Sequence, residues 1–197
     1  MAKIITISHQ KGGVGKSTLA LNLAYKFGQE VRTALTDTDP QGSTMQLKNI
    51  AEGIDILEFT NISELKKLPY DVIFVDTPPY LMADIYPIFL ESDFVLVPTK
   101  AGVPDIIAIR ATIELVKAAQ SKSNLKSAIV LNMVKPRVSI TQQAIEQLGQ
   151  YNIPIIGEIK DRTVYSNTFL TGGVFSSTDT LAKEEIDNLS TSILNFF

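Results

Sequence analysis

Residues 10–18 place two lysines, three glycines and two hydroxyl side chains in an order suited to binding phosphate. They read Gln10-Lys11-Gly12-Gly13-Val14-Gly15-Lys16-Ser17-Thr18. Glycines let successive backbone N–H groups turn inward around phosphate oxygens, and a helix that starts here adds the positive end of its dipole. Lys16 would reach the β- and γ-phosphates of a nucleotide, and the Ser17 hydroxyl would bind Mg²⁺. The segment therefore predicts a phosphate-binding loop.

The entrance of this loop departs from the strict phosphate-loop pattern. That pattern has a glycine where this chain has Gln10, and the chain carries an additional lysine, Lys11. A glycine-rich turn with lysines placed by chance is the alternative interpretation. It is disfavoured because a β-rich run, Lys3–Ile7, precedes the loop and a helical pattern follows it.

Two later segments end apolar runs with carboxylates. One is Asp37-Thr38-Asp39-Pro40-Gln41-Gly42, and the other is Asp71-Val72-Ile73-Phe74-Val75-Asp76-Thr77-Pro78-Pro79. Taken alone, each aspartate could equally be a turn or capping residue. Because they follow a phosphate loop in chain order, we expect Asp37 and Asp76 to lie near Mg²⁺ or its waters.

Short β-rich runs alternate with helical patterns along the chain. We expect strands at Ile4–Ser8, Val31–Thr36, Val72–Val75, Phe94–Val97, Ala128–Met133 and Ile153–Ile159. We expect helices at Ser17–Phe27, Ile62–Leu68, Ala83–Glu91, Pro104–Ala119, Ile140–Leu148 and Leu181–Leu194. This alternation predicts an α/β fold, a doubly wound and mostly parallel sheet with helices on both faces. Ligands in such folds bind at the carboxyl ends of strands, where the residues above stand.

Composition excludes several classes of site. The chain has 197 residues, which suggests one domain over 1–197, and its 18 basic and 21 acidic residues give a net charge of −3. It has no cysteine, which excludes disulfides, iron–sulfur clusters and a thiol nucleophile, and its one histidine, His9, makes a His-rich metal site improbable. We expect His9 to neighbour the loop rather than act as a base. No apolar run reaches about 18 residues, and a strand begins almost at Met1, so we expect a cytoplasmic protein.

Together these motifs resemble the ParA/MinD family of deviant Walker ATPases, and the Asp-Pro-Gln-Gly segment resembles ParA in particular. The resemblance implies a P-loop NTPase fold, ATP and Mg²⁺ as cofactors, and slow hydrolysis without a partner. It implies catalytic roles for Lys11, which would reach the partner subunit's phosphates, for Lys16, and for Asp39, which would orient the attacking water. Nucleotide contacts would come from Gly12, Gly13, Val14, Gly15, Lys16, Ser17, Thr18 and, at the adenine, Asn132. Metal contacts would come from Ser17, Asp37 and Asp76.

The same resemblance implies a function. Small ParA-type proteins lack an N-terminal helix-turn-helix domain, and here the loop begins at Lys11. We therefore expect a partitioning or positioning switch for a plasmid, chromosome or other cargo. ATP would drive formation of a homodimer that binds DNA without sequence preference at the nucleoid. A ParB-like protein or cargo adaptor would stimulate hydrolysis and release it.

Basic residues are concentrated in one window. From Arg110 to Arg137 the chain has six basic residues and a single acid, Glu114, although its total charge is negative. Candidate DNA contacts are Arg110, Lys117, Lys122, Lys126, Lys135, Arg137, Lys160 and Arg162. Such a patch would give a salt-dependent, sequence-independent grip on phosphates. Solvated surface lysines remain an equal alternative.

Two other functions stay open. A MinD-like membrane-cycling ATPase would need an amphipathic C-terminal helix with a basic polar face. Here the polar face of Lys183–Phe197 is acidic, so we expect this segment to pack on the sheet, although Phe196 and Phe197 keep the membrane alternative open. A metabolic P-loop enzyme, such as an ATP-dependent carboxylase or amidoligase, would not need Lys11.

Overall fold

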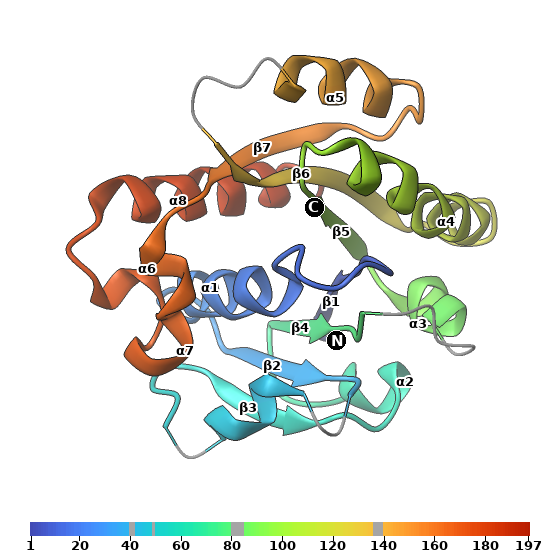
Figure 1. Ribbon diagram of the computed structural model, residues 1–197. Coiled ribbons are helices and arrows are strands. Elements are labelled where there is room, and N and C mark those ends of the chain that lie inside the picture. The colour runs from blue at the N-terminus through green and yellow to red at the C-terminus, as the bar shows by residue number, and fades with distance from the viewer. Residues whose placement is uncertain (40–41, 49, 80–84, 136–139) are drawn as a thin grey trace.

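A parallel sheet runs through the centre of the molecule (Figure 1). The computed structural model describes residues 1–39, 42–48, 50–79, 85–135 and 140–197, and within them the strand order is β3-β2-β4-β1-β5-β6-β7. The strands are β1 (Lys3–Ile7), β2 (Thr33–Asp37), β3 (Asp55–Glu58), β4 (Val72–Asp76), β5 (Phe94–Thr99), β6 (Lys126–Val134) and β7 (Ile155–Lys160). Every pairing among them is parallel, which confirms the predicted sheet.

Helices cover both faces of this sheet (Figure 1). They are α1 (Lys16–Gly28), α2 (Ile62–Leu65), α3 (Ile85–Glu91), α4 (Val103–Gln120), α5 (Ile140–Gly149), α6 (Thr163–Ser166), α7 (Thr168–Thr171) and α8 (Thr180–Leu194). Two 3₁₀ helices are η1 (Ser43–Leu47) and η2 (Val174–Ser176). The predicted α/β architecture is confirmed.

Alternate residues of the central strands feed two separate cores. Ile5 and Phe74 face the core beneath α1 and α8, whereas Ile4 and Ile73 face the core beneath α3, α4 and α5. All four side chains are fully buried. Strands apolar on both faces are what a parallel sheet covered by helices requires, so these runs read as continuous hydrophobic segments.

The register of the central strands brings the candidate residues to the carboxyl edge of the sheet, the side on which the carboxyl ends of all the parallel strands lie. Asp37 at the end of β2 is paired with Asp76 at the end of β4, and Asp76 is paired with Ile7 at the end of β1. Because parallel strands end at the same edge, the loop after Ile7 lies beside both carboxylates. The fold therefore assembles one site from segments that are far apart in sequence.

The edge strand β3 was not predicted. Asp55–Glu58 has charged residues at both ends, and Ile56 is its only buried residue. A four-residue strand with so little apolar content has almost no periodic signal. It forms because its backbone pairs with β2 over Ala34–Asp37.

The C-terminal helix packs on the sheet, as predicted. The buried residues of α8 include Ile186, Leu189 and Ile193, which join the core beneath α1. Phe196 then packs edge-on against Phe94, with the two ring centroids 5.1 Å apart. Phe197 remains about half exposed. Among the helices that the structure describes, none is both long and apolar enough to cross a bilayer.

Candidate functional site

The loop between β1 and α1 has the backbone that its glycines predict. Gly13 and Gly15 have φ angles of 69° and 89°, in the left-handed region that favours glycine. A side chain on Gly15 would in addition overlap the amide of Asn132. Helix α1 starts directly after Gly15, so its first N–H groups have no partner within the helix and can bind an anion.

This loop forms one wall of a pocket of about 420 Å³ at the carboxyl edge of the sheet. The pocket is lined by Gly12, Gly13, Gly15, Lys16, Ser17, Thr18, Asp37, Asp39, Gly42, Asp76, Thr77, Pro78, Pro79 and Met133. The set contains most of the residues predicted to bind nucleotide or metal. The structure therefore brings the phosphate loop and all three predicted aspartates to one cavity.

Lys16 is the buried cation of this pocket. Its Nζ donates a hydrogen bond to the carbonyl oxygen of Lys11 at 3.2 Å, and only 6% of the residue is exposed. Burial lowers the pKa of Lys16, whereas the nearby carboxylates of Asp76 and Asp37 raise it. A buried ammonium with few protein partners is well placed to bind a phosphate oxygen.

Asp76 is the buried carboxylate opposite this lysine. Burial, together with the charge of Asp37, raises the pKa of Asp76 to about 7, although hydrogen bonds from Ser17 and from the Thr77 N–H favour its ionised form. Two carboxylates held this close in a buried site repel each other. The Lys16 ammonium offsets part of this repulsion, and an added cation would offset more of it.

Asp37 is fixed by its own set of hydrogen bonds. The Thr44 hydroxyl donates to Asp37 Oδ2, and the Asp39 backbone N–H donates to Asp37 Oδ1 at 2.9 Å. Burial is the main cause that raises the pKa of Asp37. A side chain on Gly42 would overlap this carboxylate, so the close approach requires glycine.

The oxygen donors Ser17, Asp37 and Asp76 suit a magnesium ion held together with phosphate. Mg²⁺ in nucleotide sites usually has one or two protein carboxylates, with phosphate oxygens and waters completing the octahedron. Within the described parts of the chain, no three acidic or histidine side chains gather to hold a metal by themselves. The donor set therefore fits a metal that arrives with a nucleotide rather than a free-standing metal centre.

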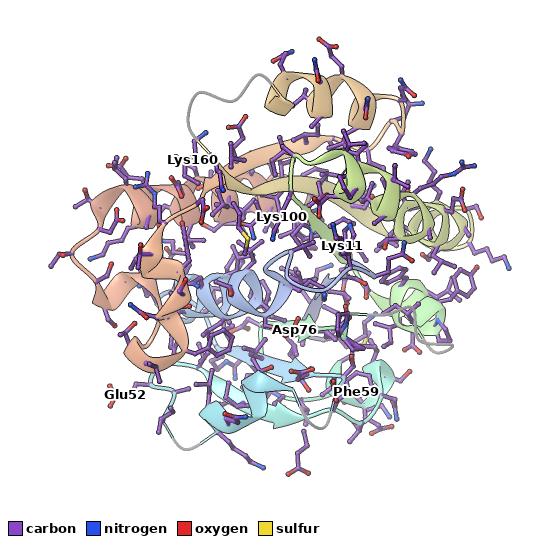
Figure 2. The ribbon with its side chains drawn as sticks, viewed as in Figure 1. Lys11, Glu52, Phe59, Asp76, Lys100 and Lys160 are labelled. Atoms are coloured by element: carbon purple, nitrogen blue, oxygen red, sulfur yellow. The ribbon has the colours of Figure 1, made fainter. Side chains whose placement is uncertain are left out.

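Lys11 behaves differently from Lys16. Its Nζ pairs with Asp105 Oδ1 of α4 at 2.7 Å, and its side chain is 38% exposed. The described residues that line the 420 Å³ pocket include Lys16 but not Lys11. Figure 2 labels Lys11 and Asp76 near the centre of the molecule. The two lysines of the loop are thus held in separate places.

One stripe of α4 holds the entrance of the loop. The Gln10 backbone N–H donates to Thr112 Oγ1 at 3.2 Å, and the Gln10 side chain donates to the carbonyl of Ala108. With Asp105 these residues follow helical spacing, so they share a face. The sequence analysis missed Asp105 and Thr112. Aspartates are common in the first turn of a helix, so the sequence does not single out Asp105. Its ion pair with Lys11 becomes evident only in the structure.

Comparisons with known proteins agree with this geometry. Residues 5–172 match the family described as the CobQ/CobB/MinD/ParA nucleotide binding domain. The chain belongs to this family. The match confirms the resemblance found in the sequence, and with it a ParA-type P-loop ATPase as the class of protein.

The relatives of this ParA/MinD-family protein include partitioning and positioning proteins. It is 31% identical over 184 residues to the maintenance of carboxysome distribution protein A of Halothiobacillus neapolitanus, covering 85% of this chain and 84% of that one. It is 26% identical over 206 residues to the sporulation initiation inhibitor protein Soj of Bacillus subtilis, covering 77% and 80%. Its fold also matches a putative plasmid partition protein of Borrelia burgdorferi bound to AMPPNP, with a TM-score of 0.79, 21% identity and full coverage of both chains.

Asn132 supports the loop in this family member. Its Nδ2 donates to the carbonyl of Val14 at 2.8 Å, and its Oδ1 accepts the Met133 N–H at 2.9 Å. A small adjoining cavity of about 80 Å³ is lined by Thr18, Leu19, Asn132, Met133, Lys160, Asp161, Arg162, Tyr165 and Ser166. The predicted adenine contact thus lies at this cavity, but the amide hydrogen bonds of Asn132 are made within the protein.

The predicted DNA-binding residues do not form a single patch. Lys126 starts strand β6, whereas Lys135 follows its carboxyl end, so these two lysines lie at opposite ends of the strand. Arg137 lies outside the described residues. Lys117 and Lys122 belong with Lys126, near the end of α4 and the start of β6.

The remaining basic residues are close to acids. Arg110 pairs with Glu114 at 2.8 Å on the exposed face of α4. Arg162 pairs with Glu185 of α8 at 2.9 Å, and Lys160 pairs with its strand neighbour Glu158 at 2.6 Å. Lys160 lies at the end of β7, on the same sheet edge as the nucleotide pocket (Figure 2).

Proposed function

We propose that this protein is a magnesium-dependent ATPase of the partitioning or positioning type, acting as a single domain that dimerises when it binds ATP. The observation that carries the proposal is the separation of the two loop lysines. Lys16 is buried in the pocket, whereas Lys11 is half exposed and paired with Asp105 outside it. A loop that served one nucleotide in one subunit would need only Lys16.

The pocket supplies what ATP binding requires. Backbone N–H groups of Gly12–Gly15 and the start of α1 would surround the phosphates, and Lys16 would neutralise them. Ser17, Asp37 and Asp76 would hold Mg²⁺, which supplies positive charge between the β- and γ-phosphate oxygens. With that charge present, Asp76 is expected to ionise fully, because the cation offsets both the cost of burying this carboxylate and the repulsion from Asp37.

Asp39 is the residue we assign to the attacking water. It lies on the pocket wall two residues after Asp37, and its backbone N–H is fixed by the Asp37 carboxylate. Its carboxylate would hold a water in line with the γ-phosphate. Removing it should leave nucleotide binding intact and stop hydrolysis.

Lys11 would complete the catalytic site of a second subunit. In the free chain it is tied to Asp105, so the monomer lacks the cation that would stabilise the transferring phosphoryl group. Slow hydrolysis by isolated subunits follows from this arrangement. In a dimer, Lys11 would leave Asp105 and reach the opposite nucleotide, so that dimerisation and catalysis are coupled.

DNA would be the matrix on which the dimer is held. Those candidate basic side chains that the structure describes lie in separate groups, so a monomer would bind duplex DNA weakly. Two subunits joined by ATP would double these contacts, and avidity alone would make binding depend on ATP. A ParB-like protein or an adaptor on the cargo would then release the dimer by stimulating hydrolysis.

Duplex binding under three nucleotide conditions tests this function. The experiment measures anisotropy of a labelled nonspecific duplex with ATP, ADP or no nucleotide, at two salt concentrations, for the wild type and Asp39→Ala. We expect salt-sensitive binding with ATP only, stronger in Asp39→Ala. Binding in no condition would contradict the DNA-matrix function. ATP-dependent pelleting with anionic liposomes instead would favour a MinD-like membrane cycle.

A further inference from the structure

His9 lies directly before the loop and is completely buried. Its Nδ1 accepts the backbone N–H of Lys11 at 2.8 Å. This contact spans two residues, the reach of the side-chain-to-backbone turns that Asn and Asp make. The imidazole therefore fixes the backbone at the residue on which the proposed function depends.

The hydrogen bond determines the protonation state of the ring. Nδ1 can accept only when it carries no proton, so the proton of the neutral ring is on Nε2. Burial, with a further contribution from the charge of Lys16, lowers the pKa of His9 to about 4, although Asp105 acts in the opposite direction. His9 is therefore neutral and able to accept near neutral pH.

The other ring nitrogen, Nε2, is the second polar atom of the His9 side chain. His9 Nε2 is buried and has no hydrogen-bond partner among the residues that the structure describes. A buried N–H without a partner costs free energy, so packing alone does not favour a polar ring at this position. Among the residues that the structure describes, the His9 side chain hydrogen-bonds to the Lys11 N–H alone, which points to that contact as the reason for a polar side chain here.

We propose that His9 is a positioning residue for hydrolysis, which acts by holding the Lys11 backbone so that its ammonium group can move from Asp105 to the nucleotide of a second subunit. It is not placed to act as a base, because it is absent from the described lining of the nucleotide pocket. The inference rests on the proposed function of Lys11. It goes beyond that function in assigning a second residue, which is not among the described residues that line the pocket.

The three contacts at residues 9–11 each hold a different part of the loop entrance. His9 holds the Lys11 backbone, Gln10 ties the chain to α4 through Thr112, and Asp105 holds the Lys11 ammonium. Only the last contact must break for Lys11 to reach another subunit. The backbone N–H groups of Gln10 and Lys11 are both held by hydrogen bonds. The Lys11 side chain can therefore leave Asp105 without displacing the Gly12–Gly15 loop, which would bind the phosphates.

Two substitutions of similar shape isolate the hydrogen bond. Asn and Leu both branch at Cγ, but Asn Oδ1 can accept the Lys11 N–H from the position of His9 Nδ1, whereas a leucine methyl cannot. The variants are His9→Asn and His9→Leu, with Lys11→Ala as the reference for removal of the Lys11 ammonium. Each is assayed for binding of a fluorescent ATP analogue with Mg²⁺, for dimerisation by sedimentation with ATP, and for steady-state hydrolysis.

We expect His9→Leu to bind ATP as the wild type does, and to lose hydrolysis by at least about tenfold, since misplacing a catalytic group by about 1 Å can cost about 100-fold. His9→Asn should keep the dimerisation and hydrolysis of the wild type. If His9→Leu does not fold, His9→Ala gives the same comparison. Equal loss in His9→Asn and His9→Leu would overturn the assignment, as would wild-type hydrolysis in His9→Leu.

The reference variant separates this inference from the proposed function. If Lys11→Ala hydrolyses ATP normally, the trans-acting lysine is wrong and the role of His9 is overturned with it. If Lys11→Ala loses hydrolysis while His9→Leu retains it, only the assignment of His9 is overturned.

Discussion

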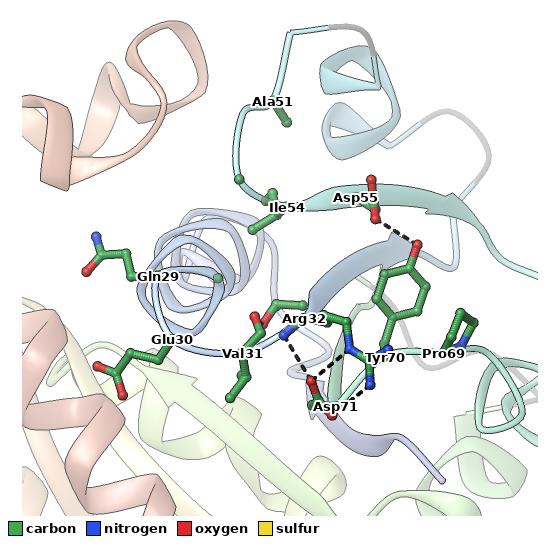
Figure 3. Close-up of a pocket in the computed structure, with 13 residues that line it drawn as sticks. Gln29, Glu30, Val31, Arg32, Ala51, Ile54, Asp55, Pro69, Tyr70 and Asp71 are labelled. Carbon is green, nitrogen blue, oxygen red and sulfur yellow. Dashed lines mark hydrogen bonds and ion pairs between the residues drawn. The ribbon is translucent and has the colours of Figure 1, made fainter.

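Two pockets lie at opposite ends of the strands and differ in how their charged groups are buried and paired. The candidate nucleotide pocket at the carboxyl edge has about 420 Å³, and a pocket at the amino edge has about 830 Å³ (Figure 3). In the amino-edge pocket, Arg32 pairs with Asp71, and the Tyr70 hydroxyl donates to Asp55 at 2.8 Å. Those charged groups satisfy each other and are exposed to water.

The carboxyl-edge pocket is smaller but chemically incomplete. Lys16, Asp37 and Asp76 are buried, and both carboxylates have pKa values raised mainly by burial. Backbone N–H groups at the start of α1 also lack partners within the helix. The difference teaches that buried charged groups, rather than cavity size, distinguish the candidate site in this fold.

The largest effect is expected from Lys16→Ala. The variant removes the only lysine of the nucleotide pocket among the described residues, so binding of MgATP should be abolished. Titration with a fluorescent ATP analogue measures it. Retained affinity would show that the phosphates bind elsewhere.

Lys11→Ala should have the next largest effect, and on a different step. ATP binding should be unchanged, because Lys11 lies outside the pocket. Hydrolysis should fall by about 10³-fold, the lower end of the effect of a cation supplied in trans. Phosphate release at saturating ATP gives the rate, and a rate near that of the wild type would contradict the trans-acting lysine.

Asp76→Asn should change the pH dependence of stability. The folded protein raises the pKa of Asp76 from about 3.8 to about 7, so between these pH values the folded state holds a proton that the unfolded state has lost. Stability of the nucleotide-free wild type should therefore fall as pH rises from about 4 to about 7, and then level off. The loss should reach a few kcal/mol at most, at about 1.4 kcal/mol per pKa unit.

Thermal unfolding without nucleotide, from pH 5 to pH 8, measures this effect. The melting temperature of Asp76→Asn should fall less over that range than that of the wild type. Asp71→Asn is the matched control from the amino-edge pocket, where the Arg32 pair lowers the pKa of Asp71. It should keep the wild-type decline, and a decline in Asp76→Asn as steep as in the wild type would contradict the assignment.

The smallest effect is expected from Arg32→Ala. Arg32 belongs to an exposed ion pair at the larger pocket, and such pairs contribute little to stability. ATP affinity, hydrolysis and melting temperature should all stay close to wild-type values. A clear loss of ATP affinity would break the distinction between the two pockets.

The strand-end residues could be predicted from sequence because their signals are local. Gly13, Gly15 and Lys16 lie in one short segment, and Asp37 and Asp76 each end a buried strand. Their meeting at one edge then follows from the parallel topology alone.

What the sequence could not give depends on contacts between distant segments. Asp105 is 94 residues from Lys11, and the ion pair depends on how α4 packs beside the loop. The window from Arg110 to Arg137 is basic in sequence, yet those of its basic residues that the structure describes lie on α4, in the turn after α4 and at both ends of β6. A count of charges along the chain cannot show that these basic residues lie apart in the folded protein.

Sedimentation of Asp39→Ala and of the double variant Lys11→Ala/Asp39→Ala, with ATP and with ADP, tests the central claim most directly. Because neither variant should hydrolyse ATP, the experiment isolates the role of Lys11 in joining two subunits. We predict that Asp39→Ala is a dimer with ATP and a monomer with ADP, and that the double variant binds ATP but stays a monomer. A double variant that dimerises with ATP as readily as Asp39→Ala would contradict the account.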